Sequence, residues 1–234
     1  MEEKSYYRKK VWEQMEEEDI ARFPRPVEGR IPNFVGAAGT AEMIDDIEEY
    51  RGAGRIKVNP DSPQNPVRAK IIRDDKTLFM PTPRLREGFL RIDPQDVPEG
   101  REKKATTIKH SDVYGESVHL EDIEEIDLVV AGSVAVSPRG ERVGKGGGYS
   151  DLEYAILKEL GLGEPPVLTT VHPVQVFERL PQEEHDVPLD FVVTTEKVIE
   201  TRTDLSKPSG IEWSLLDEEE LDEMPVLKEI KKIS

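Results

Sequence analysis

The longest apolar run of the chain is DLVVAGSVAV at residues 127–136, in which only Asp127 and Ser133 are polar. A valine-rich run of this kind predicts a strand covered on both faces, because a strand facing solvent would alternate apolar with polar residues. Shorter runs of the same character predict further strands at 56–59, 76–80, 167–171 and 191–194. The pattern therefore indicates a buried sheet with residues 127–136 as its central strand.

Helical periodicity occupies stretches between these runs. Residues 2–19 are strong helix formers, and Val11, Met15 and Ile20 make a narrow apolar stripe along them. Three more segments are predicted to be helical, namely 40–50 with Thr40 as its N-cap, 60–72 and 150–160. Residues 93–126 are polar and acidic and follow neither period. A chain of 234 residues with this pattern is long enough for one well-buried α/β domain.

A glycine-rich segment leads from the central run to the helix predicted at 150–160. Four of the five residues from Gly144 to Gly148 are glycine, and the fifth is Lys145. Glycines let the backbone approach an anion, and the N–H groups opening the next helix point at it, so the order strand, loop, helix suits a phosphate. Asp151 then stands where a carboxylate can hold the Mg²⁺ of a triphosphate. The alternative is a tight corner in which Asp151 only stabilises the helix N-terminus.

Two pairs of basic residues are further candidates for binding an anion. Lys4 and Arg8 are four residues apart and share one face of the first helix, where they contact a ligand or are simply solvated. Arg84 and Arg86 follow the strand at 76–80, at the edge of the sheet where α/β proteins usually bind ligands. We expect this second pair to face the carboxylate tail or the phosphates of a substrate, with a plain structural loop as the alternative.

The composition excludes several classes of protein. Asp and Glu number 49 against 32 Lys and Arg, a formal charge of −17 that repels nucleic acid and anionic lipid. No apolar run is long enough to span a membrane, and the absence of cysteine excludes disulfides and makes the cytoplasm the default compartment. The four histidines lack metal-binding spacing. We expect one domain over 1–234 with an acidic tail from about 207, a small-molecule substrate, and a monomer or small homo-oligomer.

Two segments resemble motifs of a known family and occur in its order. RVGKGGGYSD at 142–151 is similar to the R-L-G-x-G-x-G-Y-Y-D loop of the 5-formyltetrahydrofolate cyclo-ligases, also called methenyltetrahydrofolate synthetases. EHDVPLD at 184–190 is similar to their later E-H-D-x-x-x-D motif. The chain most resembles the archaeal branch and the first domain of the eukaryotic methenyltetrahydrofolate synthetase domain-containing protein, from about Lys4 to Trp213.

The resemblance implies a three-layer α/β fold in which helices flank a mostly parallel central sheet, as in the sugar-phosphate isomerase and CoA-transferase group. It also implies a reaction in which ATP and Mg²⁺ are used to close 5-formyltetrahydrofolate, or a related reduced formyl-pterin, to its 5,10-methenyl form. Such a phosphoryl transfer depends on positioning and charge stabilisation rather than on a protein nucleophile.

The resemblance also implies roles for individual residues. The family's nucleotide-binding positions fall on Lys4, Arg8, Arg142, Gly144, Lys145, Gly146, Gly147, Gly148 and Tyr149. Catalytic roles are expected for Lys145 and Arg142, and magnesium binding for Asp151 and Asp186. Substrate binding is expected for Arg84, Arg86 and Tyr149.

The chain departs from the family pattern at three points. Ser150 replaces the second tyrosine of the loop, Gly147 replaces a basic residue, and no acid lies at Gln64 or Asn65, where the cyclo-ligases have a glutamate that contacts the pterin. A pterin site needs hydrogen bonds matched to the ring. Two alternatives therefore stay open: a non-catalytic nucleotide- or ligand-binding or regulatory paralogue, and a related ATP-dependent enzyme that acts on another small heterocycle.

Overall fold

The computed structural model describes residues 2–86, 88–119 and 122–233. Within them, eight strands form a mixed sheet in the order β12-β11-β10-β7-β3-β4-β5-β6. Strands β11, β10, β7, β3 and β4 run parallel, whereas β12, β5 and β6 are antiparallel to the strands beside them. The bounds are β3 Arg55–Val58, β4 Thr77–Pro81, β5 Phe89–Ile92, β6 Glu116–Val118, β7 Leu128–Val130, β10 Val167–Thr170, β11 Phe191–Val193 and β12 Val198–Glu200.

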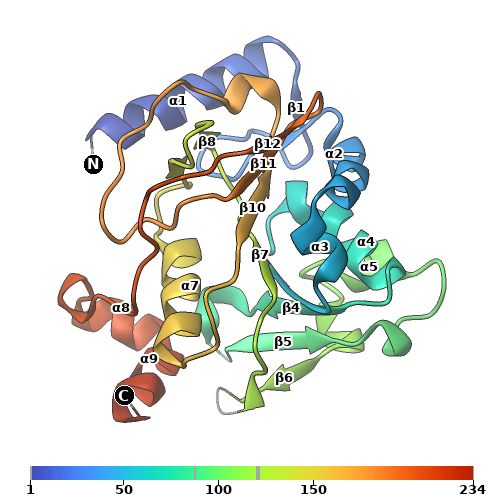
Figure 1. Ribbon diagram of the computed structural model, residues 1–234, viewed down its shortest axis with the longest axis vertical. Helices are drawn as coiled ribbons and strands as arrows, with labels where there is room; N and C mark the ends of the chain where they lie inside the picture. The colour runs from blue at the N-terminus through green and yellow to red at the C-terminus, as the bar shows by residue number, and fades with distance from the viewer. Residues whose placement is uncertain (1, 87, 120–121, 234) are drawn as a thin grey trace.

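Helices cover both faces of this sheet (Figure 1). One face carries α7 Tyr149–Glu159 with the C-terminal helices α8 Glu218–Glu223 and α9 Pro225–Ile233. The other face carries α2 Ala37–Met43, α3 Glu48–Gly52, α4 Asn65–Arg73 and α5 Glu102–Ala105. Shorter helical elements are α6 Ser111–Tyr114 and the 3-10 turns η1 Ile44–Asp46, η2 Ser62–Gln64, η3 Pro83–Leu85, η4 Pro94–Asp96, η6 Pro173–Gln175 and η7 Trp213–Leu215. The predicted α/β fold, with helices flanking a mostly parallel central sheet, is confirmed.

A third packed cluster lies beyond one end of the sheet. The helix predicted at 2–19 is α1 Glu2–Glu17, and the residues of its predicted stripe, Val11, Met15 and Ile20, are buried. They pack with two small antiparallel pairs, β1 Ala21–Arg22 with β2 Asn33–Phe34, and β8 Ala135–Val136 with β9 Arg142–Val143. Figure 1 shows α1 beside β8, so the first helix lies at the end of the sheet from which the glycine segment starts.

The run 127–136 is not one strand, so that prediction was wrong. It contributes β7 to the large sheet and, after the irregular residues 131–134, β8 to a separate pair. The irregular residues stay buried because side chains replace the missing strand partners. Asn59 Oδ1 accepts the N–H of Gly132 at 3.1 Å, and Gln175 Nε2 donates to the next two carbonyl oxygens at 3.0 and 3.1 Å. Apolar composition predicts that a run is buried, but not what it pairs with.

The helix predicted at 40–50 is divided into α2, η1 and α3. Thr40 is not its N-cap, because its hydroxyl donates to the carbonyl oxygen of Ala37 at 2.8 Å inside α2. The helix instead begins after Gly36, whose φ of 90° favours glycine. A Cβ at this position would lie 2.7 Å from Cγ2 of Thr195, so the close approach also requires glycine.

The acidic segment from about residue 207 packs against the rest of the protein. Leu227 and Ile230 of α9 are fully buried in the same cluster as α7. Trp213 is partly buried there, and Lys231 Nζ lies 5.5 Å from the centroid of its ring. Among the described helices, none combines the length and the apolar composition needed to cross a bilayer.

We expect stability to fall when the pH drops below about 6.5, because of His172. Its Nδ1 accepts the N–H of Val174 at 3.4 Å, and burial lowers its pKa, although Glu196 and Glu18 oppose the shift. The unfolded chain, with a pKa of about 6.5, binds the proton more tightly, so stability present above that pH is lost as the pH falls through the folded-state value. Urea unfolding of wild type and His172→Asn at pH 7.5 and 5.5 tests this. Asparagine can keep the cap but cannot titrate, so an equal pH dependence in both proteins contradicts the assignment.

Candidate functional site

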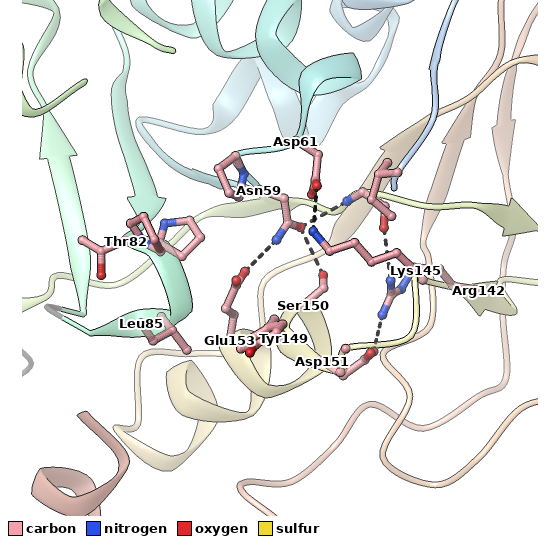
Figure 2. Close-up of a pocket in the computed structure, with 18 residues that line it drawn as sticks. Asn59, Asp61, Thr82, Leu85, Arg142, Lys145, Tyr149, Ser150, Asp151 and Glu153 are labelled. Carbon is pink, nitrogen blue, oxygen red and sulfur yellow. Dashed lines mark hydrogen bonds and ion pairs between the residues drawn. The ribbon is translucent and has the colours of Figure 1, made fainter. Parts of the chain in front are cut away.

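A cavity of about 310 Å³ lies at the carboxyl ends of β3, β4 and β7 (Figure 2). The chain crosses from β3 to β4 through α4, and from β7 to β10, on the other side, through α7. The strand order therefore reverses between β3 and β7, and ligands of α/β proteins usually bind at such a point. The cavity is lined by Ile31, Asn59, Pro60, Asp61, Pro81, Thr82, Pro83, Leu85, Gly132, Arg142, Gly144, Lys145, Gly147, Gly148, Tyr149, Ser150, Asp151 and Glu153.

The glycine segment forms one wall of this cavity, between β9 and α7. Gly146 and Gly148 have φ angles of 114° and 65°, a backbone conformation that is strained for residues with a side chain. Gly148 is the N-cap of α7. A Cβ at Gly147 would lie 2.9 Å from the ring of Tyr149, so the basic residue of the family pattern would displace this ring. Tyr149 and Ser150 begin α7 at the cavity, where backbone N–H groups have no partner within the helix. The wall therefore has the form of an anion site.

Two predicted cations reach the cavity. The side chain of Arg142 is 2% exposed, donates through Nη1 to the carbonyl oxygen of Gly132 at 3.1 Å, and forms a short ion pair with Asp151. Burial alone would lower the pKa of Arg142, but the carboxylate of Asp151 raises it above its ordinary value. Lys145 lies beside it, half-exposed, with Nζ 3.1 Å from Asp61 Oδ1. One cation is therefore held rigidly and the other is held by a single surface contact.

Lys4 and Arg8 lie behind the glycine wall rather than in the cavity. Lys4 Nζ is within 2.6 to 2.7 Å of both carboxylate oxygens of Asp186 and 2.6 Å from Glu183. This hydrogen bond from Lys4 lowers the pKa of Glu183. Arg8 Nε donates to the carbonyl oxygen of Gly144 at 2.7 Å, and burial lowers its pKa. The two residues thus fasten α1 to the glycine segment and to the loop of Asp186, and neither is a solvated surface charge.

The two predicted metal ligands belong to neighbouring parts of the site. Asp151 Oδ1 accepts the N–H of Val187, the residue after Asp186, at 2.9 Å. Asp151 lines the cavity, whereas Asp186 does not lie among its lining residues and has its charge neutralised by Lys4. Carboxylate oxygens are the donors that Mg²⁺ prefers. The donor set therefore fits a magnesium ion in kind, and binding through Asp186 has to compete with Lys4.

Of the two arginines predicted to bind substrate, Arg86 does not line this cavity. Arg86 is exposed and lines a different pocket, with His119 and Glu229. The side chain of Arg84 lies outside the described part of the structure. From this segment the cavity receives the apolar Pro83 and Leu85 instead, because the chain turns into η3 directly after β4.

A buried polar network under the cavity was not identified from the sequence. Lys57 and Glu153 form a short ion pair, with side chains 1% and 5% exposed. Asn59 Nδ2 donates to Glu153 at 2.7 Å, and its Oδ1 accepts from the Ser150 hydroxyl at 3.1 Å as well as from Gly132. Burial raises the pKa of Glu153, while Lys57 opposes the shift. A lysine within an otherwise buried strand was the signal that could have revealed this network.

The family model for the 5-formyltetrahydrofolate cyclo-ligase family matches residues 3–195. This chain belongs to that family. The methenyltetrahydrofolate synthase domain-containing protein of Bos taurus is 43% identical over 234 residues, 96% of this chain and 60% of that protein. The Homo sapiens protein of the same name is 40% identical, again over 96% of this chain and 60% of the relative. The chain thus spans about three fifths of these relatives, and the expected likeness to the eukaryotic domain-containing protein is confirmed.

Two more distant cyclo-ligase relatives agree with this assignment. The 5-formyltetrahydrofolate cyclo-ligase of Escherichia coli is 35% identical over 78 residues, which cover 33% of this chain and 41% of that one. The NMR structure of the Aquifex aeolicus 5,10-methenyltetrahydrofolate synthetase covers 87% of this chain and 95% of its own, with a TM-score of 0.54 and 21% identity. The second comparison supports the fold. The expected likeness to the archaeal branch of the cyclo-ligases stays a prediction.

The structure shows the contacts made at two of the positions where the chain departs from the cyclo-ligase pattern. Ser150, in place of a tyrosine, ties the start of α7 to Asn59. Gln64 is fully buried, and its amide has no hydrogen-bond partner among the described residues. Asn65 donates to the carbonyl oxygens of Lys103 and Thr106 at 3.3 Å. Neither Gln64 nor Asn65 lines the cavity.

Proposed function

We propose that this protein is an ATP- and Mg²⁺-dependent cyclo-ligase that converts 5-formyltetrahydrofolate, or a related reduced formyl-pterin, to the 5,10-methenyl form with release of ADP and phosphate. The observation that carries the proposal is the cavity at the strand reversal, where a glycine wall, Arg142 and Lys145 converge in a chain of the cyclo-ligase family. The chain acts as one domain over 1–234, with the segment from 207 packed as part of it.

The reaction needs two bond exchanges. The formyl oxygen on N5 bonds to the γ-phosphorus of ATP while the bond to the β-phosphate oxygen breaks, so that ADP leaves. N10 then attacks the activated formyl carbon, the carbon–oxygen bond breaks, phosphate leaves, and the proton of N10 is lost as the methenyl bridge closes. Negative charge is transferred between phosphate oxygens in the first exchange, and fixed positive charge and N–H donors stabilise it.

The described residues contribute to this stabilisation in different ways, depending on how rigidly each is held. The N–H groups at Gly148 to Ser150 and the buried Arg142 offer a fixed electropositive surface for the β- and γ-phosphates. Arg142 Nε has no hydrogen-bond partner in the described structure, which leaves this donor for a ligand. Lys145 exchanges its surface contact with Asp61 for the γ-phosphate. Lys4 and Arg8 contribute by holding the glycine wall and the loop of Asp186 in place.

Mg²⁺, when bound, neutralises charge on the phosphate oxygens. Of the two predicted ligands, Asp151 lines the cavity at the strand reversal, here called the phosphate cavity, and Asp186 stands behind it on the next loop. We therefore infer that Asp151 is the principal ligand, and that Asp186 joins it where Lys4 gives up its contact.

The direct test follows methenyl absorbance and phosphate release after 5-formyltetrahydrofolate is added to the protein with Mg·ATP. Methenyl formation that requires both ATP and Mg²⁺ supports the proposal. Calorimetric binding of Mg·ATP without any effect of formyl-folates or formyl-pterins rejects it, and favours the regulatory or ligand-binding paralogue. One observation favours this second candidate. The amide of Gln64, at the position of the family's pterin glutamate, is buried and has no hydrogen-bond partner among the described residues.

We expect Asp151→Asn to raise the dissociation constant of Mg·ATP by at least about 10–100-fold, because metal sites lose this much affinity even when only a partner of a ligand is changed. The fold is expected to persist at a lower stability, because asparagine still accepts the N–H of Val187 but no longer neutralises the buried Arg142. Calorimetry with a non-hydrolysable ATP analogue measures the change. Asp204→Asn, which removes an exposed carboxylate, is the matched control. Equal affinities in both variants remove Asp151 from the metal site.

A further inference from the structure

A second cavity, of about 330 Å³, adjoins the phosphate cavity. Both are lined by Pro60, Pro81, Thr82 and Pro83, so the segment after β4 is a wall between them. The far side of the second cavity comes from residues 108–117, within the segment whose sequence shows no pattern. Each cavity is at the lower end of the range of about 300–1,000 Å³ typical for ligand sites. A nucleotide together with a folate therefore needs both of them.

The second cavity has apolar walls and one carboxylate. Met80, Leu90 and Ile108 line it, and Ile108 is 57% exposed, which leaves apolar surface for a ligand to cover. Asp112, at the start of α6, also lines it. Its carboxylate makes no hydrogen bond or ion pair with the residues that the structure describes. The cavity therefore suits a flat, apolar ring system that carries N–H donors on its edge.

We propose that this second cavity binds the amino-substituted ring of the reduced folate and that Asp112 determines specificity for it, by accepting hydrogen bonds from ring N–H and exocyclic amino groups. This inference rests on the proposed cyclo-ligase function. The reacting N5 belongs to that ring and has to reach the γ-phosphate, so the ring must lie next to the phosphate cavity. The wall at Pro81 to Pro83 separates the two cavities by a few side chains only.

The charge of Asp112 decides which end of the substrate can occupy this cavity. The p-aminobenzoyl-glutamate end of a folate carries carboxylates, which an unpaired acid repels. The ring end carries neutral N–H donors, for which a carboxylate is a strong acceptor. Asp112 thus supplies the hydrogen-bond acceptor for the ring. Gln64 and Asn65 cannot supply it, since neither of these lines the phosphate cavity or the second cavity.

The test is calorimetric titration of the full chain with two fragments, 6-methyltetrahydropterin and p-aminobenzoyl-glutamate, and with 5-formyltetrahydrofolate. Asp112→Asn is expected to weaken binding of the pterin and of the folate by about 10–100-fold, because hydrogen bonds to a charged group are lost. Affinity for p-aminobenzoyl-glutamate and for Mg·ATP is expected to stay the same. Asp96→Asn removes another exposed carboxylate outside the cavity and is the matched control.

Each other outcome has a definite meaning. Unchanged pterin affinity in Asp112→Asn overturns the inference, and so does tighter binding of p-aminobenzoyl-glutamate, which would place the tail in this cavity. If the wild-type protein forms the methenyl product and either result is found, this inference fails while the cyclo-ligase function still holds. Pterin binding that depends on Asp112, without methenyl formation, supports the inference and rejects the function. No binding of either fragment or of the folate by wild type rejects both.

Discussion

Lys57→Met is expected to lower the free energy of unfolding by about 3–5 kcal/mol, the largest stability change that we expect from one substitution in the site. Lys57 and Glu153 are both almost fully buried and form a short ion pair. Removing the lysine leaves a carboxylate in a region of low dielectric with only Asn59 to hydrogen-bond it. Loss of one partner from a buried pair typically has an effect of this size. Urea unfolding of the single variant at pH 7.5 measures it.

The double variant Lys57→Met/Glu153→Gln is expected to recover most of this loss. The glutamine oxygen can still accept the hydrogen bond from Asn59, and no buried charge remains without a partner. Lys158→Met is the matched control, since Lys158 pairs with the exposed Glu164 and its removal should change stability by less than about 1 kcal/mol. A double variant no more stable than Lys57→Met would show that the lysine acts through packing rather than through the charge of Glu153.

Lys145→Met is expected to lower kcat by about 10²–10³-fold with little change in stability. The proposed role of Lys145 is to meet charge on the γ-phosphate as it transfers, and a lost donor of this type usually costs that factor. Its contact with Asp61 is at the surface, with the lysine side chain 42% exposed, so the fold does not depend on it. Steady-state phosphate release and thermal unfolding of the same preparation measure both quantities.

The effect of Lys145 is expected to fall mainly on kcat rather than on the KM for ATP, because the interaction strengthens in the transition state. Lys9→Met provides the control, since Lys9 is 75% exposed on α1 and forms only a surface pair with Glu13. Wild-type turnover in Lys145→Met would refute the catalytic role. A fall in melting temperature larger than that of Lys9→Met would point to a structural role instead.

Four of the five parallel strands of the large sheet, and the helices α1, α4 and α7, could be predicted because their signals are local. The strands predicted at 56–59, 76–80, 167–171 and 191–194 are β3, β4, β10 and β11, within one or two residues. The glycine segment was recognisable for the same reason, because positive φ angles at Gly146 and Gly148 select glycine whatever surrounds them. The prediction for 127–136 failed because burial does not specify a partner. Side chains of Asn59 and Gln175, both distant in the sequence, form the hydrogen bonds of the backbone between β7 and β8.

The sequence by itself determined the family, the α/β class and the position of the glycine segment, since these depend on residue order along short segments. Only the tertiary structure decided how the charges pair. Lys4 meets Asp186 across 182 residues, Lys57 meets Glu153 across 96, and Lys145 meets Asp61 across 84. Each buried charge needs an opposite charge within contact distance, and the packing of α1, α7 and the strand ends selects which one it finds. The same packing separates Arg86 from the phosphate cavity and brings Asp112 to the cavity beside it.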